Sequence, residues 1–270
     1  HKVCLKPINK GDPIIKYDQI IGFASKNITA GEHVHSHNLE FKEFDREFQV
    51  KNKKTIVDEK VDTFFNGILR DNGQVATRNY IGIVSTVNCS ATVTKMIVEK
   101  IKYSNILNDY PNIDGIVPIT HSTGCGMNTV SEGMQMFQRT IDGFKNHPNF
   151  SHVFVIGLGC ECAQVSLFDE SVKKHNRIHF LTIQDEGGTK KIVEKVLSQI
   201  KNLLPEANKI KRTPQSVSHL TLALQCGGSD GYSGITANPA LGVAADLLVK
   251  KGGSSILSET PEIYGAEHLL

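Results

Sequence analysis

The sequence lacks the features of a membrane protein, a dedicated nucleic-acid binder and a disulfide scaffold. No apolar run approaches the roughly 20 residues of a membrane-spanning helix, and no signal-peptide pattern stands at the start. Its 30 basic and 28 acidic residues give a net charge of +2, too small for a nucleic-acid-binding surface. Six cysteines are too thinly spread for a disulfide framework, so reduced thiols in a cytoplasmic protein are expected.

What is present is the composition of a globular protein, with 39% hydrophobic and 21% charged residues in a chain of 270. Residues 1–40 contain short strand-like segments bounded by glycine and proline, which predict a small β module. Residues 41–62 are dense in charge and are interpreted as a solvated linker, which leaves 63–270 as an α/β domain. Both ends of the chain look cut, so we expect part of a longer protein.

In residues 63–270, apolar strand-like runs alternate with segments of helical periodicity. This alternation predicts βαβ units and a mostly parallel sheet covered on both faces. We expect strands at 80–86, 114–119, 153–158, 178–183, 220–225 and 254–258, and helices near 91–103, 128–142, 162–175, 189–204 and 240–251.

Four cysteines, Cys89, Cys125, Cys160 and Cys226, follow predicted strands. Ligands of open α/β sheets bind outside the carboxyl ends of the strands, and thiolates are good ligands for iron and iron–sulfur clusters. One interpretation is therefore a metal or cluster site made by Cys125, Cys160 and Cys226. The other is packing, because cysteine behaves as a small hydrophobe and no CxxC spacing supports a cluster.

Two glycine-rich loops, 122–126 and 227–231, could bind an anion. Successive backbone N–H groups at the start of a helix bind phosphate or carboxylate. Neither loop matches GxGxxG or GxxxxGK[ST], so nucleotide binding has little support, and a carboxylate substrate fits equally well.

Histidines supply a second set of candidates. His33, His35 and His37 alternate on a predicted strand, which would place them on one face for metal binding or acid–base work. An exposed polar strand face is the alternative. His121 lies four residues before Cys125 in a loop at a strand end, where it could act as a base or a ligand.

The segment 258–268 collects three carboxylates and a histidine after the last predicted strand. Glu262 follows Thr260-Pro261 and is explained as part of a helix start. Glu259 stands at the strand end, where that explanation is weaker, and is therefore a catalytic candidate.

Longer motifs run along the chain: RDNG at 70–73, TRN at 77–79, THSTGCG at 120–126, GLGCE at 157–161, QCGGSDGYSGITANP at 225–239 and SETPE at 258–262. These motifs resemble the altronate dehydratase / galactarate dehydratase family across essentially the whole chain. The first 40 residues resemble the later part of the small β-clip (SAF) module that begins these enzymes, and the family's usual chain continues beyond residue 270. The fold implied is a SAF-like N-terminal module followed by a mostly parallel α/β sheet domain.

This resemblance implies dehydration of a sugar acid to a 2-keto-3-deoxy acid, with Fe²⁺ or another divalent metal such as Mn²⁺ required. A base would remove the proton beside the carboxylate, and a metal or N–H groups would stabilise the enolate-like intermediate. A general acid would then assist departure of the β-hydroxyl.

The resemblance does not divide these roles among residues, and our assignments are as follows. His121 and Glu259 are assigned to catalysis, and Arg78, Ser229 and Asp230 to orienting carboxylate and hydroxyls, with a surface role as the alternative for Arg78. The metal ligands are assigned as His35, His37, Cys125, Cys160 and Cys226, and an iron–sulfur cluster in place of a mononuclear metal stays open.

Two other functions stay open beside sugar-acid dehydration. One is a related lyase such as a sulfolactate sulfo-lyase, and the other is a non-catalytic fragment with a role in binding or assembly. The expected partner is a small sugar acid, with neither nucleic acid nor membrane involved and a homo-oligomer possible.

Overall fold

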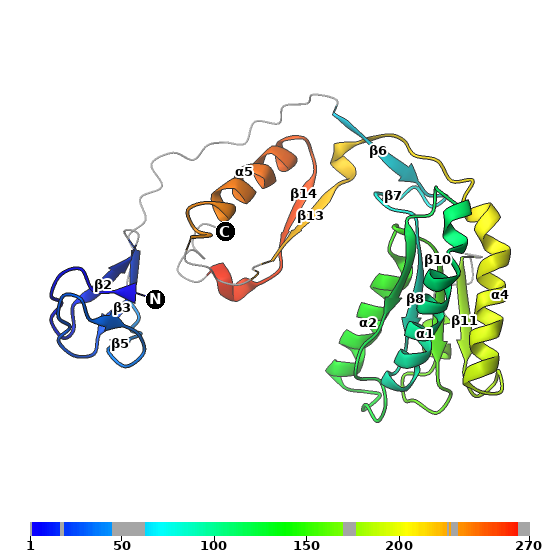
Figure 1. Cartoon of the computed structure of the whole chain (residues 1–270), viewed down its shortest axis with the longest axis horizontal. Coiled ribbons are helices and arrows are strands. Elements are labelled where there is room, and N and C mark those ends of the chain that lie inside the picture. The colour runs from blue at the N-terminus through cyan, green and yellow to red at the C-terminus, as the bar shows by residue number, and fades with distance from the viewer. Residues whose placement is uncertain are drawn as a thin grey trace. The chain divides into compact units, whose positions relative to one another are not determined.

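The computed structural model describes residues 2–16, 19–44, 63–169, 177–225, 227 and 232–263. These residues belong to two compact units. The first takes in residues 1–55 and 260–270, and the second takes in residues 56–259. Figure 1 shows both units and labels their larger elements.

The first unit contains a small β module, as the sequence predicted. Strand β1 (Lys2–Val3) pairs antiparallel with β4 (His33–Val34), and β3 (Gln19–Ala24) pairs antiparallel with both β2 (Pro13–Lys16) and β5 (Leu39–Glu40). Its small core is buried at Cys4, Ile14, Ala24, Ile28 and Val34.

The second unit is built on a four-stranded parallel sheet in the order β11-β10-β8-β9, which confirms the predicted α/β architecture. Its strands are almost continuously apolar because helices cover both of their faces. The bounds are β8 (Tyr80–Ser85), β9 (Gly115–Ile119), β10 (Phe150–Gly157) and β11 (Ile178–Thr182).

Two separate cores lie on the two faces of this sheet (Figure 1). Helices α1 (Asn88–Ser104) and α4 (Thr189–Ala207) pack on one face, against alternate strand residues that include Ile83 and Phe154. Helices α2 (Glu132–Asn146) and α3 (Ser166–Asp169) pack on the other face, where the next residue of each strand points. The one-residue alternation between faces follows from the pleat of a β-strand.

A second, antiparallel sheet was not predicted from the sequence. It has the order β12-β6-β7, with β6 (Phe64–Leu69), β7 (Val75–Ala76) and β12 (Thr213–Ser216). The short helix η1 (Ile106–Asp109) follows α1, and η2 (Val217–His219) follows β12.

The last part of the second unit is a βαβ unit. Strands β13 (Thr221–Leu224) and β14 (Ser254–Leu257) pair in parallel and are connected through helix α5 (Ala237–Lys250). The short helix η3 (Thr260–Ile263) follows β14 in the sequence and belongs to the first unit.

Two helices differ most from their predicted bounds. Helix α2 begins at Glu132, four residues later than expected, because Ser131 caps it and accepts a hydrogen bond from the Met134 N–H. The helix expected at 162–175 is observed only as α3, and its remainder from 170 lies outside the described residues. Among the helices described, none is both long and apolar enough to cross a membrane.

Candidate functional site

Three loops meet at the carboxyl edge of the four-stranded sheet, where β8, β9 and β10 end in the same direction. The loop after β9 lies directly on the end of β8, because the Asn88 N–H donates to the Thr123 carbonyl at 2.8 Å. Gly124 makes this approach possible. Its φ is +99°, and a Cβ there would collide with the backbone of Thr86 and Val87.

His121 is held by both of its ring nitrogens at this edge. Nδ1 accepts from the Thr123 N–H at 3.2 Å, which leaves Nε2 protonated to donate to the Ser85 carbonyl at 2.9 Å. The ring also makes an edge contact with Phe137, with centroids 4.8 Å apart. His121 can therefore accept a substrate proton only after its bond to Thr123 opens.

A buried carboxylate that the sequence analysis did not single out closes the loop after β10. Glu161 is 2% exposed, and its Oε1 accepts from the Thr86 hydroxyl at 2.9 Å and from the Leu158 N–H at 3.0 Å. Its Oε2 accepts from the Gly159 N–H at 2.6 Å. The signal that could have found it was an acidic residue within a glycine-rich turn, a position where free N–H groups need an acceptor.

Three of the cysteines at this edge are exposed, whereas Cys162, in the loop after β10, is partly buried and packs against the core. Cys125 and Cys160 are exposed free thiols on the loops after β9 and β10, and Cys89 is exposed at the start of α1. The packing interpretation describes Cys4, which is buried in the first unit, but it does not describe these three. Cys226 lies outside the described residues.

His35 and His37 lie in the first unit, and the prediction that they alternate along a strand was wrong. Strand β4 ends at Val34, and the backbone turns because the Asn38 side chain accepts from the His35 N–H at 3.0 Å. The turn still gathers the rings. The centroid of His33 lies 5.6 Å from that of His35 and 5.9 Å from that of His37.

The assigned metal ligands are only partly brought together. His35 and His37 belong to one unit, whereas Cys125 and Cys160 belong to the other. Within the part of the chain that the structure describes, no group of three or more His, Cys, Asp or Glu side chains could hold a metal ion. The donors are of a type that suits divalent iron, but the described residues do not form a complete ligand set.

Glu259 lies at the carboxyl edge of the β13–β14 pair and is partly buried. The Ser258 N–H donates to the Leu224 carbonyl at 3.0 Å, so the chain leaving β14 runs beside the chain leaving β13. Ser229 and Asp230 follow β13 in the sequence, but both lie outside the described residues.

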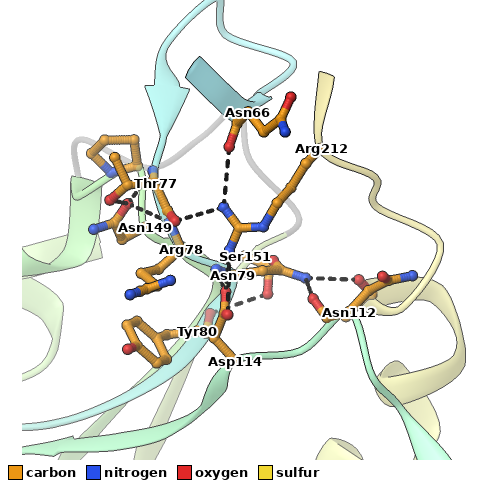
Figure 2. A network of polar contacts seen from close by, with 12 residues as sticks. Asn66, Thr77, Arg78, Asn79, Tyr80, Asn112, Asp114, Asn149, Ser151 and Arg212 are labelled. Atoms are coloured by element: carbon orange, nitrogen blue, oxygen red, sulfur yellow. Dashed lines mark hydrogen bonds and ion pairs between the residues drawn. The ribbon is translucent and has the colours of Figure 1, made fainter. Parts of the chain in front are cut away.

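Arg78 lies at the opposite, amino edge of the four-stranded sheet, two residues before β8 begins (Figure 2). The backbone N–H of Arg78 donates to the side-chain oxygen of Asn149 at 3.1 Å, and its backbone carbonyl accepts from the Arg70 guanidinium at 3.2 Å. The side chain is exposed. The structure does not bring Arg78 together with His121 or the cysteines of the carboxyl edge.

A polar network surrounds Arg78 and explains much of the RDNG and TRN motifs in structural terms (Figure 2). The Arg212 guanidinium donates to the Thr77 carbonyl at 2.7 Å and forms an ion pair with Asp114 at 3.0 Å. Asp114 also accepts from the N–H of the buried Asn79 at 2.5 Å, and the Asn79 side chain accepts from Arg70 at 3.2 Å. These contacts join the antiparallel sheet to the amino edge of the parallel one.

Three family models match successive parts of the chain. The altronate/galactarate dehydratase SAF domain matches residues 1–42. The second domain of D-galactarate dehydratase/altronate hydrolase matches residues 67–208. The C-terminal model of D-galactarate/altronate dehydratase matches residues 217–270.

Individual relatives agree with these models. An altronate dehydratase of Escherichia coli (strain K12) is 34% identical over all of this chain, and a galactarate dehydratase (L-threo-forming) of the same organism is 35% identical. A (2R)-sulfolactate sulfo-lyase subunit beta of Chromohalobacter salexigens is 26% identical over 76% of the chain and 49% of its own length. The chain spans about half the length of both dehydratases, 54% in each case. The chain therefore belongs to the altronate/galactarate dehydratase family.

Proposed function

We propose that this chain supplies part of an enzyme that dehydrates a sugar acid of the altronate or galactarate type to a 2-keto-3-deoxy acid. The observation that carries the proposal is the order of the three family matches, which together cover residues 1–42, 67–208 and 217–270. The relatives that match the whole chain are named as dehydratases of altronate and galactarate, whereas the sulfo-lyase subunit matches less of it.

The proposed reaction removes water from a 2,3-dihydroxy acid. A base takes the proton from the carbon beside the carboxylate, and the electron pair of that C–H bond forms the double bond as the neighbouring C–O bond breaks. An acid protonates the departing hydroxyl, which leaves as water. The enol that remains becomes the 2-keto acid by moving its proton to the adjacent carbon.

Glu259 and His121 are the proposed proton carriers. Glu259 is a partly buried carboxylate at the carboxyl edge of two parallel strands, the edge at which α/β proteins bind ligands. His121 lies at the corresponding edge of the larger sheet, but the Thr123 N–H occupies its Nδ1. Its participation therefore requires that hydrogen bond to open when substrate binds.

Fe²⁺ or another divalent metal is the proposed cofactor, with Cys125 and Cys160 of the second unit as candidate ligands. The support is the donor chemistry together with the exposure of the Cys125 and Cys160 thiols. A bound metal would act as a Lewis acid toward the developing negative charge. The described residues do not complete its ligand set, so no step above depends on the metal.

The direct test is a keto-acid assay of the gene product at its natural length, purified under argon with Fe²⁺, on altronate, galactarate and sulfolactate. Turnover of altronate or galactarate is expected. Release of sulfite from sulfolactate alone would favour the related lyase. No turnover of any of the three would contradict the proposal and favour a role in binding or assembly.

Variants then separate the proposed roles. Glu259→Gln should lower kcat by at least about 100-fold, since general acid–base groups contribute roughly 10²–10⁴ to rate. Cys125→Ser and Cys160→Ser should lower bound iron measured by mass spectrometry. Cys89→Ser is the matched control, because Cys89 is also an exposed thiol beyond a strand end but is not an assigned ligand. Equal iron content in all variants would remove these cysteines from the metal site.

A further inference from the structure

A pocket of about 560 Å³ lies at the amino edge of the parallel sheet, where β10 and β11 begin. Its walls include Arg70, Ser151, His152 and Arg177, with Ala207 from the end of α4. The candidate catalytic loops lie at the other edge of the same sheet. The pocket is therefore separate from the site of the proposed function.

Two guanidinium groups, those of Arg70 and Arg177, line this pocket. Arg70 donates to the Pro148 carbonyl at 2.8 Å, the Asn79 side chain at 3.2 Å and the Arg78 carbonyl at 3.2 Å. Toward residues that the structure describes, the guanidinium of Arg177 makes one hydrogen bond, which it donates to the Phe150 carbonyl at 2.8 Å. Among the described residues, neither arginine forms an ion pair with an acidic side chain.

The acidic residues of the pocket do not cancel this charge. Glu206 also lines it, but its carboxylate is paired with Lys209 at 2.6 Å. Burial and the charge of Arg177 lower the pKa of Arg70 to about 10, and the nearby Asp71 opposes this shift without reversing it. Burial contributes most to this shift in pKa, and the positive charge of Arg177 contributes next.

His152, which lines the pocket, lies beside His179, and the positive charges of Arg177 and Arg70 contribute to the low pKa of His152. His152 and His179 stack with centroids 5.6 Å apart, and Nδ1 of His152 lies 3.3 Å from Nε2 of His179. Burial, His179 and then the charges of Arg177 and Arg70 lower the pKa of His152 to about 4. A neutral His152 at physiological pH keeps its remaining ring nitrogen available as a hydrogen-bonding group beside the arginines.

We propose that this pocket binds a small oxyanion, the phosphate or carboxylate group of a metabolite, through those N–H donors of Arg177 and Arg70 that make no hydrogen bond to a described residue. A guanidinium presents paired N–H groups whose spacing matches two oxygens of a phosphate or carboxylate. Two such groups in one concave, half-buried site favour an anion over a neutral ligand. The site does not depend on the proposed dehydration, so the two can fail separately.

The test is calorimetric titration of the full chain with inorganic phosphate and, separately, with malonate, at ionic strength held constant with chloride. Arg177→Gln should weaken binding at least tenfold, because it removes one of the two guanidinium groups that line the pocket. Arg139→Gln is the matched control, since Arg139 is an exposed arginine of α2 outside the pocket. Tighter binding of phosphate or of malonate identifies which anion the pocket prefers.

A second readout does not depend on any variant. A bound anion would stabilise the imidazolium form of His152 and raise its pKa from about 4, which an NMR titration of the histidine ring protons would detect.

Arg177→Lys, which keeps the charge but loses the paired donors, should bind more weakly than the wild type. Absence of binding by both anions, or equal affinity in Arg177→Gln and the wild type, would overturn the proposal.

Discussion

The Thr86 hydroxyl donates a 2.9 Å hydrogen bond to the buried carboxylate of Glu161, which joins the end of β8 to the loop after β10. The same carboxylate accepts the N–H groups of Leu158 and Gly159. One side chain thus satisfies three donors and fixes the loop that presents Cys160. Glu161 touches none of the proposed reacting groups, so its role is to position this loop.

Glu161→Gln should lower the free energy of unfolding by about 1–3 kcal/mol, because the amide NH₂ would face a donor where the carboxylate now accepts. Modification of Cys160 by a thiol reagent, followed by mass spectrometry, should also become faster as the loop loosens. Glu206→Gln is the control. It removes an exposed ion pair with Lys209, for which about 0–1 kcal/mol is expected. Equal stability losses in the two variants would contradict this role for Glu161.

The fully buried Lys145 is a second polar group that the core depends on. Its ammonium group forms an ion pair with Asp142 at 2.5 Å and donates to the Phe168 carbonyl at 2.6 Å, which ties α2 to α3. Lys145→Met keeps the apolar stem but leaves that carbonyl without this donor. We expect a loss of about 1–3 kcal/mol in urea denaturation followed by circular dichroism.

Lys95→Met provides the comparison for Lys145, because Lys95 is an exposed lysine of α1. It should change stability by less than about 0.5 kcal/mol. If both methionine variants unfold at the same urea concentration, the contacts of Lys145 with Asp142 and Phe168 contribute nothing measurable.

Alanine substitutions at Gly124 and Gly126 distinguish the destabilisation caused by a steric clash from that caused by backbone strain. Gly124 and Gly126 both have positive φ, +99° and +61°, but only at Gly124 would a Cβ collide with Thr86 and Val87. Gly126→Ala should lower the free energy of unfolding by about 1–2 kcal/mol, because residue 126 has a left-handed backbone conformation. Gly124→Ala should cost more, since it must also push the loop off β8. If Gly124→Ala and Gly126→Ala have the same midpoint of urea unfolding, the loop does not pack against the end of β8.

The sequence was sufficient to predict the four-stranded parallel sheet, because its strands are apolar on both faces and alternate with amphipathic helices. The two strands expected at 220–225 and 254–258 form a separate parallel pair, β13–β14, and do not extend that sheet. The sequence did not reveal the antiparallel sheet. Its strand β12, with the sequence TPQS, is short and polar, and it pairs with β6 from more than 140 residues earlier. Pairings between such distant segments leave no local periodicity to detect.

The candidate site was predictable at the level of the sheet edge but not of individual contacts. Following each strand to its end correctly placed His121, Cys125 and Cys160 at one edge. Arg78 was grouped with the substrate because it belongs to a motif, yet that motif is held at the opposite edge by backbone contacts. Sequence position alone does not distinguish an arginine that meets a substrate from one whose neighbours are structural.

His152 and His179 should make the stability of the second unit depend on pH. Burial lowers the pKa of both below the usual value of about 6.5, and that of His152 falls to about 4. The charged groups near His152 are Arg177 and Arg70, with Asp71 on the same pocket wall. In the unfolded chain, both imidazoles take up a proton at higher pH than they do in the folded one.

Because the unfolded state binds more protons between pH 6.5 and 4, the free energy of unfolding should fall as pH decreases through this window. After allowance for solvent screening of these partly exposed rings, the loss attributable to His152 is about 1–2 kcal/mol. Urea denaturation at several pH values should show a shallower dependence in His152→Gln than in the wild type. His219→Gln, which alters an exposed histidine, should retain the wild-type slope. A steeper slope in His152→Gln would mean that His152 is protonated in the folded protein, contrary to its position beside two arginines.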